Sequence, residues 1–149
     1  MILLVHMILG ALIGQNINNP IIAVAIALLS HYLLDIIPHI EYSIKNISQK
    51  NWAKSFLEFT KVFFDVLTGL LVIFLVSNRQ PMVYVGAICA IIPDGFSFLN
   101  LFLKNKIFEL HSNIHQEKIH FLKNKKISVF WRLFSQATVV VAVVVLFLR

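Results

Sequence analysis

SHYLLDIIPH, residues 30–39, places two histidines and an aspartate at the end of a long apolar run. His31 and Asp35 are four residues apart, so on a helix both side chains can reach one centre. Pro38 lacks an N–H group and crowds the preceding turn, which predicts that the helix kinks or ends there and turns His39 toward the same centre. A single His–Asp pair of this kind also serves as a hydrogen bond that clamps two helices.

The composition of the rest of the chain indicates an integral membrane protein. Of its 149 residues, 58% are hydrophobic and only 13% are charged, and the mean hydropathy is +0.82. A soluble domain of this length does not need so much apolar material to fill one core. No Gly/Ser-rich or Pro-rich linker divides the sequence, so residues 1–149 are expected to form a single membrane domain.

Four apolar segments are long enough to cross about 30 Å of hydrocarbon, which takes about 20 helical residues. They are Pro20 to Pro38, Leu57 to Ser77, Pro81 to Leu103 and Ser128 to Leu148. Ile2 to Gly14 is shorter and is expected to form a tilted span or a re-entrant helix. The predicted fold is therefore an all-α polytopic bundle of four to five transmembrane helices. DIIPH and AIIPD lie 55 residues apart and echo each other, which favours two degenerate helical hairpins plus a C-terminal helix.

Lysines predict how this bundle is oriented. Most of the formal charge of +6 lies in two connections, Ile40 to Phe56 and Lys104 to Ile127. Positively charged connections stay on the cytoplasmic side. We therefore expect a multi-pass protein of the cytoplasmic membrane of a bacterium, with five spans, an internal N-terminus and an external Arg149. Positive charge in this position favours anionic lipid headgroups as partners and argues against nucleic acid.

Ionisable side chains recur near the cytoplasmic ends of these segments. Such a group costs several kcal/mol at membrane depth unless it is paired, ligated or hydrated, so each is a candidate for function. The candidate metal ligands are His6, His31, Asp35, His39, Asp65, Asp94, His111 and His115. So many imidazoles and carboxylates in one layer predict a metal site.

Two of the carboxylates also have plainer interpretations. Asp94 follows Pro93, which we expect to break its helix, and Pro-Asp-Gly is an ordinary turn sequence. Asp65 lies one helical turn after Lys61, so the two could form a structural ion pair.

The stretch LHSNIHQEKIH contains a further pair of candidate ligands. His111 and His115 are four residues apart, a spacing that lets both imidazoles bind one metal ion from a helical turn. Ser112 stands where the metalloprotease motif has glutamate, so that motif is absent. In an aqueous loop HxxxH is also ordinary polar surface. His120 and the run Lys118 to Lys126 are expected to form a solvated positive face at the lipid headgroups.

Together these motifs resemble those of the small bacterial membrane-bound metal-dependent hydrolases, including the LexA-binding inner-membrane type. The resemblance is carried by His6 before a Gly/Ala-rich apolar run, by SHYLLDIIPH, by AIIPDG and by HSNIH, which occur here in a different chain order. SHxxxDxxPH is also similar to ligand segments of the zinc-dependent phospholipase C and P1 nuclease superfamily. The resemblance implies a metal-dependent hydrolase that acts at the membrane.

Ligand chemistry points the same way. Imidazoles and carboxylates without thiolates suit Zn²⁺, with Mn²⁺ or Fe²⁺ as alternatives, and eight candidates allow one or two ions. We expect hydrolysis of a phosphoester or a phospholipid headgroup, with Asp35 or Asp94 bridging the metals and Glu41 as general base. Two other classes stay open. One is a divalent-metal or proton transporter, and the other is a structural membrane protein without catalysis.

Overall fold

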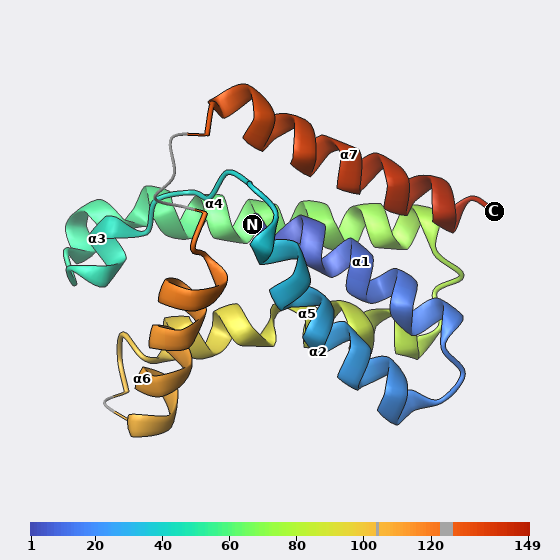
Figure 1. Cartoon of the computed structure of the whole chain (residues 1–149), viewed down its shortest axis with the longest axis horizontal. Coiled ribbons are helices and arrows are strands. Elements are labelled where there is room, and N and C mark those ends of the chain that lie inside the picture. The colour runs from blue at the N-terminus through green and yellow to red at the C-terminus, as the bar shows by residue number, and fades with distance from the viewer. Residues whose placement is uncertain (104, 123–126) are drawn as a thin grey trace.

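The computed structural model describes residues 1–103, 105–122 and 127–149. Within these residues the chain is all-α, with seven α-helices and one π-helical turn (Figure 1). The elements are α1 (Leu3–Asn16), α2 (Pro20–Ile36), α3 (Lys45–Ser48), α4 (Trp52–Val76), α5 (Pro81–Leu99), α6 (Lys106–Asn113), the π-helix η1 (Ile114–Ile119) and α7 (Val129–Phe147). The predicted all-α class is confirmed.

Three of the described helices are long and apolar enough to cross a membrane. They are α4, α5 and α7, with 25, 19 and 19 residues. Helices α1 and α2 are also apolar but have only 14 and 17 residues. Each of the five helices begins within five residues of the apolar segment predicted for it.

Helix α1 lies in the middle of the molecule and packs against α2, α4, α5 and α7. The α1–α2 and α4–α5 turns lie at one end of the long axis, together with the C-terminus (Figure 1). Helices α3 and α6 lie at the opposite end. The two lysine-rich connections, as far as they are described, are therefore at the same end of the structure.

Local signals explain where α2 begins and ends. The side chain of Asn19 accepts hydrogen bonds from the backbone N–H groups of Ile21 and Ile22, and Pro20 occupies the first helical position, where no N–H is needed. The helix ends at Ile36, and the next residue is extended, as expected before Pro38. The predicted end of this helix near Pro38 is confirmed.

Helices α1 and α5 cross with their backbones in contact. A Cβ atom added to Gly10 would lie 2.3 Å from the carbonyl oxygen of Gly86, and one added to Gly86 would lie 2.2 Å from that of Gly10. Gly14 meets the backbone of α5 one turn further along. The spacing of Gly10 and Gly14 is the GxxxG pattern of closely packed membrane helices, which the sequence analysis did not use.

The predicted break at Pro93 is wrong, because α5 continues through it to Leu99. The proline removes one hydrogen bond, to the carbonyl of Cys89, at a cost of about 3 kcal/mol. Burial of Ala87, Ala90 and Pro93 against neighbouring helices offsets this cost. Asp94 therefore projects from the middle of a helix and not from a turn.

The beginning of α1 is held at the middle of α4. Asp65 accepts a 2.6 Å hydrogen bond from the backbone N–H of Leu3, and the hydroxyl of Tyr42 donates to the same carboxylate oxygen at 3.3 Å. No ion pair joins Asp65 to Lys61 among the described residues. The first residues of the chain therefore lie inside the molecule, next to the end of α2.

Candidate metal centre

The carboxylate of Asp35 is the centre of the polar cluster. Its side chain is fully buried, and an oxygen of it lies 2.7 Å from the amino group of Met1. Ring nitrogens of five histidines face the same carboxylate. The Nε2 distances to its nearer oxygen are 3.2 Å for His6, 3.0 Å for His31, 3.8 Å for His39, 3.3 Å for His115 and 3.2 Å for His120. The cluster therefore gathers residues from Met1 to His120, which are far apart in the sequence.

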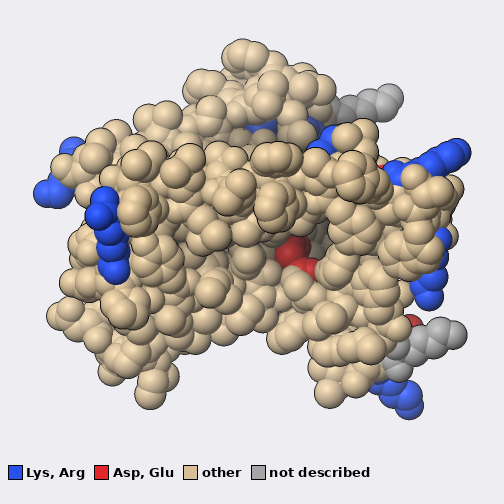
Figure 2. Space-filling model, turned by 180° about the vertical axis from the view of Figure 1, so that it is seen from behind, with Lys and Arg blue, Asp and Glu red and all other residues tan. Residues whose placement is uncertain are grey.

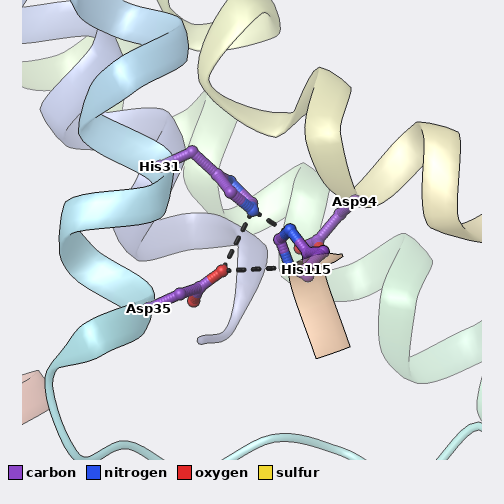
Figure 3. A group of neighbouring side chains, drawn as sticks. All are labelled: His31, Asp35, Asp94 and His115. Atoms are coloured by element: carbon purple, nitrogen blue, oxygen red, sulfur yellow. Dashed lines mark ion pairs between the residues drawn. The ribbon is translucent and has the colours of Figure 1, made fainter. Parts of the chain in front are cut away.

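Two sets of ligand atoms share this carboxylate. The first ligand group is His31, Asp35, Asp94 and His115, and the second ligand group is Asp35, His39 and His120. Within each group the ligand atoms lie within 4.8 Å of one another. Figure 3 shows the first group, whose side chains point toward one another from α2, α5 and η1. Both groups could hold a metal ion, with Asp35 common to them.

Backbone carbonyls fix the orientation of two of the imidazoles. Nδ1 of His31 lies 2.7 Å from the carbonyl oxygen of Ala90, and Nδ1 of His39 lies 2.6 Å from that of Ile37. A carbonyl only accepts, so Nδ1 of each ring carries a hydrogen, and Nε2 is the atom that faces Asp35. Metal-binding histidines are usually held in this way.

Several buried atoms at the centre have no hydrogen-bond partner, although they lie close together. They include Nε2 of His6, Nε2 of His31 and Oδ2 of Asp35. Buried polar atoms are rarely left unpaired. An ion bonded to nitrogen and oxygen at about 2.0–2.2 Å holds adjacent ligands roughly 3.0–3.5 Å apart. The separations around Asp35 match those of ligands that share an ion, so the residues fit a metal.

Two further carboxylates line the rim of the cluster. Oδ1 of Asp94 lies 3.7 Å from Nε2 of His31 and 3.6 Å from Nε2 of His115. Oε1 of Glu41 lies 3.0 Å from Nε2 of His39 and 2.8 Å from Nδ1 of His120. Their side chains are 30% and 27% exposed, so both also face solvent. Asp94 thus belongs to the first ligand group, and Glu41 borders the second.

His120 is the residue that sequence reasoning missed. It was expected on a solvated face, but it is only 5% exposed. Burial works against its protonation, yet the carboxylates of Asp35 and Glu41 outweigh this effect and raise the pKa of His120 to about 9. The π-helical turn η1 places it beside His115, because a π-helix closes with i→i+5 hydrogen bonds. The five-residue spacing of His115 and His120 does not place them on one face of an α-helix, so the sequence pattern did not indicate that they are neighbours.

Three predicted ligands lie outside both ligand groups: His6, Asp65 and His111. His6 still faces the Asp35 carboxylate at 3.2 Å. Asp65 instead caps the first turn of α1 through the backbone of Leu3. Nε2 of His111 lies 3.0 Å from the hydroxyl of Tyr32. Burial and the neighbouring His115 lower the pKa of His111. The HxxxH spacing therefore contributes one ligand to the centre, and its other histidine supports α2.

A cavity of about 790 Å³ opens onto the cluster. Figure 2 shows acidic atoms at the bottom of an opening in the middle of one face. Polar residues that line the cavity include Asp35, His39, Glu41, Asp94 and His120, and apolar ones include Ile44, Ile47, Phe59, Ile91, Phe98 and Leu101. Gly95 also lines it, and nothing lies within 4 Å of a Cβ atom added there. The cavity thus has polar ligand atoms on one part of its wall and an apolar remainder.

No known protein family, curated protein or solved structure matches this chain.

Proposed function

We propose that this chain is a membrane-embedded, metal-dependent hydrolase of phosphoesters. The phosphoester bond of a phospholipid headgroup is the substrate that a membrane offers. The observation that carries the proposal is the buried carboxylate of Asp35, which two ligand groups share beside an open cavity. A structural His–Asp clamp needs one pair and no access. Here, five imidazoles and two further carboxylates surround the same carboxylate.

The ligand set suits one or two divalent ions, with zinc favoured. His31, Asp94 and His115 would hold one ion, His39 and His120 the other, and Asp35 would bridge them. His6 faces the same carboxylate at 3.2 Å. Neutral imidazoles and carboxylates are ligands that Zn²⁺ accepts, and Mn²⁺ and Fe²⁺ accept them as well. Asp35, Asp94 and Glu41 supply three negative charges, so two divalent ions leave the centre positive and attractive to an anionic phosphoester.

Bound metal ions supply an activated water and neutralise the negative charge that develops on phosphoryl oxygens. The protein residues then have separate tasks. Asp35 and the imidazoles would hold the ions, and the Nδ1 contacts of His31 and His39 keep those rings oriented. Glu41 lines the cavity beside the second ligand group, which supports a role in accepting a proton from the attacking water.

The apolar part of the cavity wall supports a substrate that is partly lipid. Ile44, Ile47 and Phe98 border the same cavity as the ligand atoms, so a headgroup can reach the centre while its apolar part stays against these residues. Three helices of membrane-spanning length support a location in a membrane. The lysine-rich end, at which α3 and α6 lie, would face the cytoplasm of a bacterium. The motif resemblance to membrane-bound metal-dependent hydrolases agrees with this assignment.

Metal analysis and a phosphodiesterase assay on the same preparation test this function. Protein purified in detergent without chelator should contain at least one divalent ion per chain and hydrolyse bis(p-nitrophenyl) phosphate or phospholipid in mixed micelles. His115→Gln should lose both metal and activity, whereas His111→Gln should keep its metal. Wild-type protein that takes up no Zn²⁺, Mn²⁺ or Fe²⁺ would overturn the proposal. Metal-loaded protein that carries metal across vesicles but hydrolyses neither substrate would favour the transporter class.

A further inference from the structure

Two polar side chains of α7 reach back to the segment that follows α2. The hydroxyl of Ser135 donates a hydrogen bond to the carbonyl oxygen of Pro38. The side-chain amide of Gln136 donates to the carbonyl oxygen of Ile40 at 3.0 Å. These two carbonyls flank His39, a member of the second ligand group. The donors lie 97 and 96 residues further along the chain than their acceptors.

These polar groups are not needed for the packing of α7. Val139, Val140, Val143 and Phe147 pack against the apolar clusters that include residues of α1. Gln136 is only 6% exposed, and burial of an amide costs free energy unless it is hydrogen-bonded. An apolar side chain of similar size would join this face of α7 without that cost. The hydrogen bond to the Ile40 carbonyl therefore accounts for a glutamine at position 136.

The acceptor segment has little regular structure of its own. Residues 37–44 form no helix. They carry His39, whose Nε2 faces the carboxylates of Asp35 and Glu41, and they carry Glu41 itself. A ligand on irregular backbone is only as well placed as the contacts that hold that backbone.

We propose that Ser135 and Gln136 are positioning residues of the metal centre, which act through the Pro38 and Ile40 carbonyls to place His39 and Glu41. In this role α7 is part of the metal centre although none of its side chains belongs to either ligand group. The inference rests on the metal-binding part of the proposed function and not on hydrolysis. It also predicts that only the second ligand group depends on Ser135 and Gln136, because the first ligand group takes no residue from the segment that α7 holds.

Binding of Co²⁺ to the metal-free protein in detergent tests the role of these residues, by calorimetry and by the visible absorption of the bound ion. Wild-type protein should bind two ions. The second ligand group has three ligands against four in the first, so we expect it to be the weaker site. In the double variant Ser135→Ala/Gln136→Met, Co²⁺ affinity at this weaker site should fall roughly 10- to 100-fold, the usual cost of losing an outer partner of a ligand. The stronger site should keep its affinity. The absorption spectrum of the weaker site should also change, since His39 is no longer held in place.

Matched variants separate positioning from general loosening of α7. Thr138→Val also removes a hydroxyl from α7, but that hydroxyl bonds only to the Phe134 carbonyl of the same helix, so Co²⁺ binding should not change. Ser135→Thr keeps a hydroxyl and should restore the affinity that Ser135→Ala loses. If the double variant does not fold, the comparison of Ser135→Ala with Ser135→Thr carries the test. Equal affinities in wild type, Ser135→Ala and the double variant would overturn the inference, as would a wild type that binds a single ion. A wild type that binds none would instead overturn the proposed function.

Discussion

His115 and His120 are five residues apart, yet their Nε2 atoms lie only 2.9 Å from each other. In an α-helix two residues at this spacing would point about 140° apart, since each residue turns about 100°. The π-helical turn Ile114–Ile119 closes the difference, and the N–H of His120 bonds to the carbonyl of His115 at 3.1 Å. His115 belongs to the first ligand group and His120 to the second. One turn of unusual helix thus delivers a ligand to each group.

Deletion of Glu117 should be tolerated. Glu117 is exposed, and its loss shortens the spacing of the two histidines to four residues, which an ordinary α-helix places on one side. Two Co²⁺ ions should still bind, with affinities within about tenfold of wild type. Insertion of an alanine after Glu117 should instead move His120 out of the second ligand group. Equal loss of binding in both variants would show that the π-helical turn has another purpose.

Asp35→Asn should remove metal binding, whereas Asp65→Asn should preserve it. An amide at position 35 cannot bridge two cations, and it leaves buried imidazoles without their common acceptor. We expect a loss of about 3–5 kcal/mol in folding free energy, typical of a broken buried ion pair. Asparagine caps a helix as well as aspartate does, so the second variant should lose less than about 1 kcal/mol. Metal content and thermal unfolding of the two variants measure both effects.

Metal binding should strengthen as the pH rises from 6 to 8.5. The pKa of His120 is raised to about 9, so in the metal-free protein this ring holds a proton that a metal must displace. The raised pKa also stabilises the metal-free fold fully below pH 6.5, and this contribution is lost as the pH rises through 9. Thermal unfolding of the metal-free protein should therefore occur at lower temperature at pH 9.5 than at pH 6.5. The difference should be smaller in His120→Gln, and an unchanged profile would contradict the assignment.

Substitutions of Gly95 should change the access of substrate to the cavity without changing metal binding. Gly95 lines the cavity, and a side chain at this position has room, since nothing lies within 4 Å of an added Cβ atom. Gly95→Ala should stabilise α5 by about 0.5–1 kcal/mol, because glycine is a poor helix former. Gly95→Leu should lower hydrolysis of phospholipid more than hydrolysis of bis(p-nitrophenyl) phosphate, with metal content unchanged. If Gly95→Leu lowers hydrolysis of both substrates by the same factor relative to wild type, or lowers neither, substrates enter by another route.

Cysteine labelling tests the proposed orientation. In a Cys89→Ala background, Gln80→Cys should react with an impermeant maleimide added outside intact cells, and Asn113→Cys should react only after the membrane is opened. Both positions are exposed. Gln80 lies in the α4–α5 turn and Asn113 ends α6, and these two elements lie at opposite ends of the long axis (Figure 1). Labelling of Asn113→Cys from outside would reverse the orientation.

Helix placement was the part of the fold that the sequence predicted well. Apolar length located the five apolar helices, and Pro38 marked the end of α2, because both effects act through a few neighbouring residues. The break expected at Pro93 failed because packing against other helices is worth more than the single hydrogen bond that the proline removes. The role of Asp65 could not be foreseen, since its partners lie 62 and 61 residues earlier in the chain.

In the candidate site too, local spacing could be predicted from the sequence, whereas contacts between distant segments could not. His31, Asp35 and His39 could be grouped from their local spacing, and the structure brings both histidines to the carboxylate of Asp35. His120 was missed because its place depends on a π-helical turn, which residue spacing read with an α-helical period hides. Gln136 was not considered, because its hydrogen bond to Ile40 joins two segments that only the folded bundle brings together.

The wide spread of the ligands along the chain has a consequence for biogenesis. The first ligand group is complete only when His115 has been synthesised, and the second only when His120 has been. Chains emerge from the ribosome with the N-terminal part first. If the proposed function holds, the histidine of α2 would therefore be synthesised well before its ion could bind, and Asp35 would wait for η1. An ion retained after purification would then report that α2, α5 and η1 have come together.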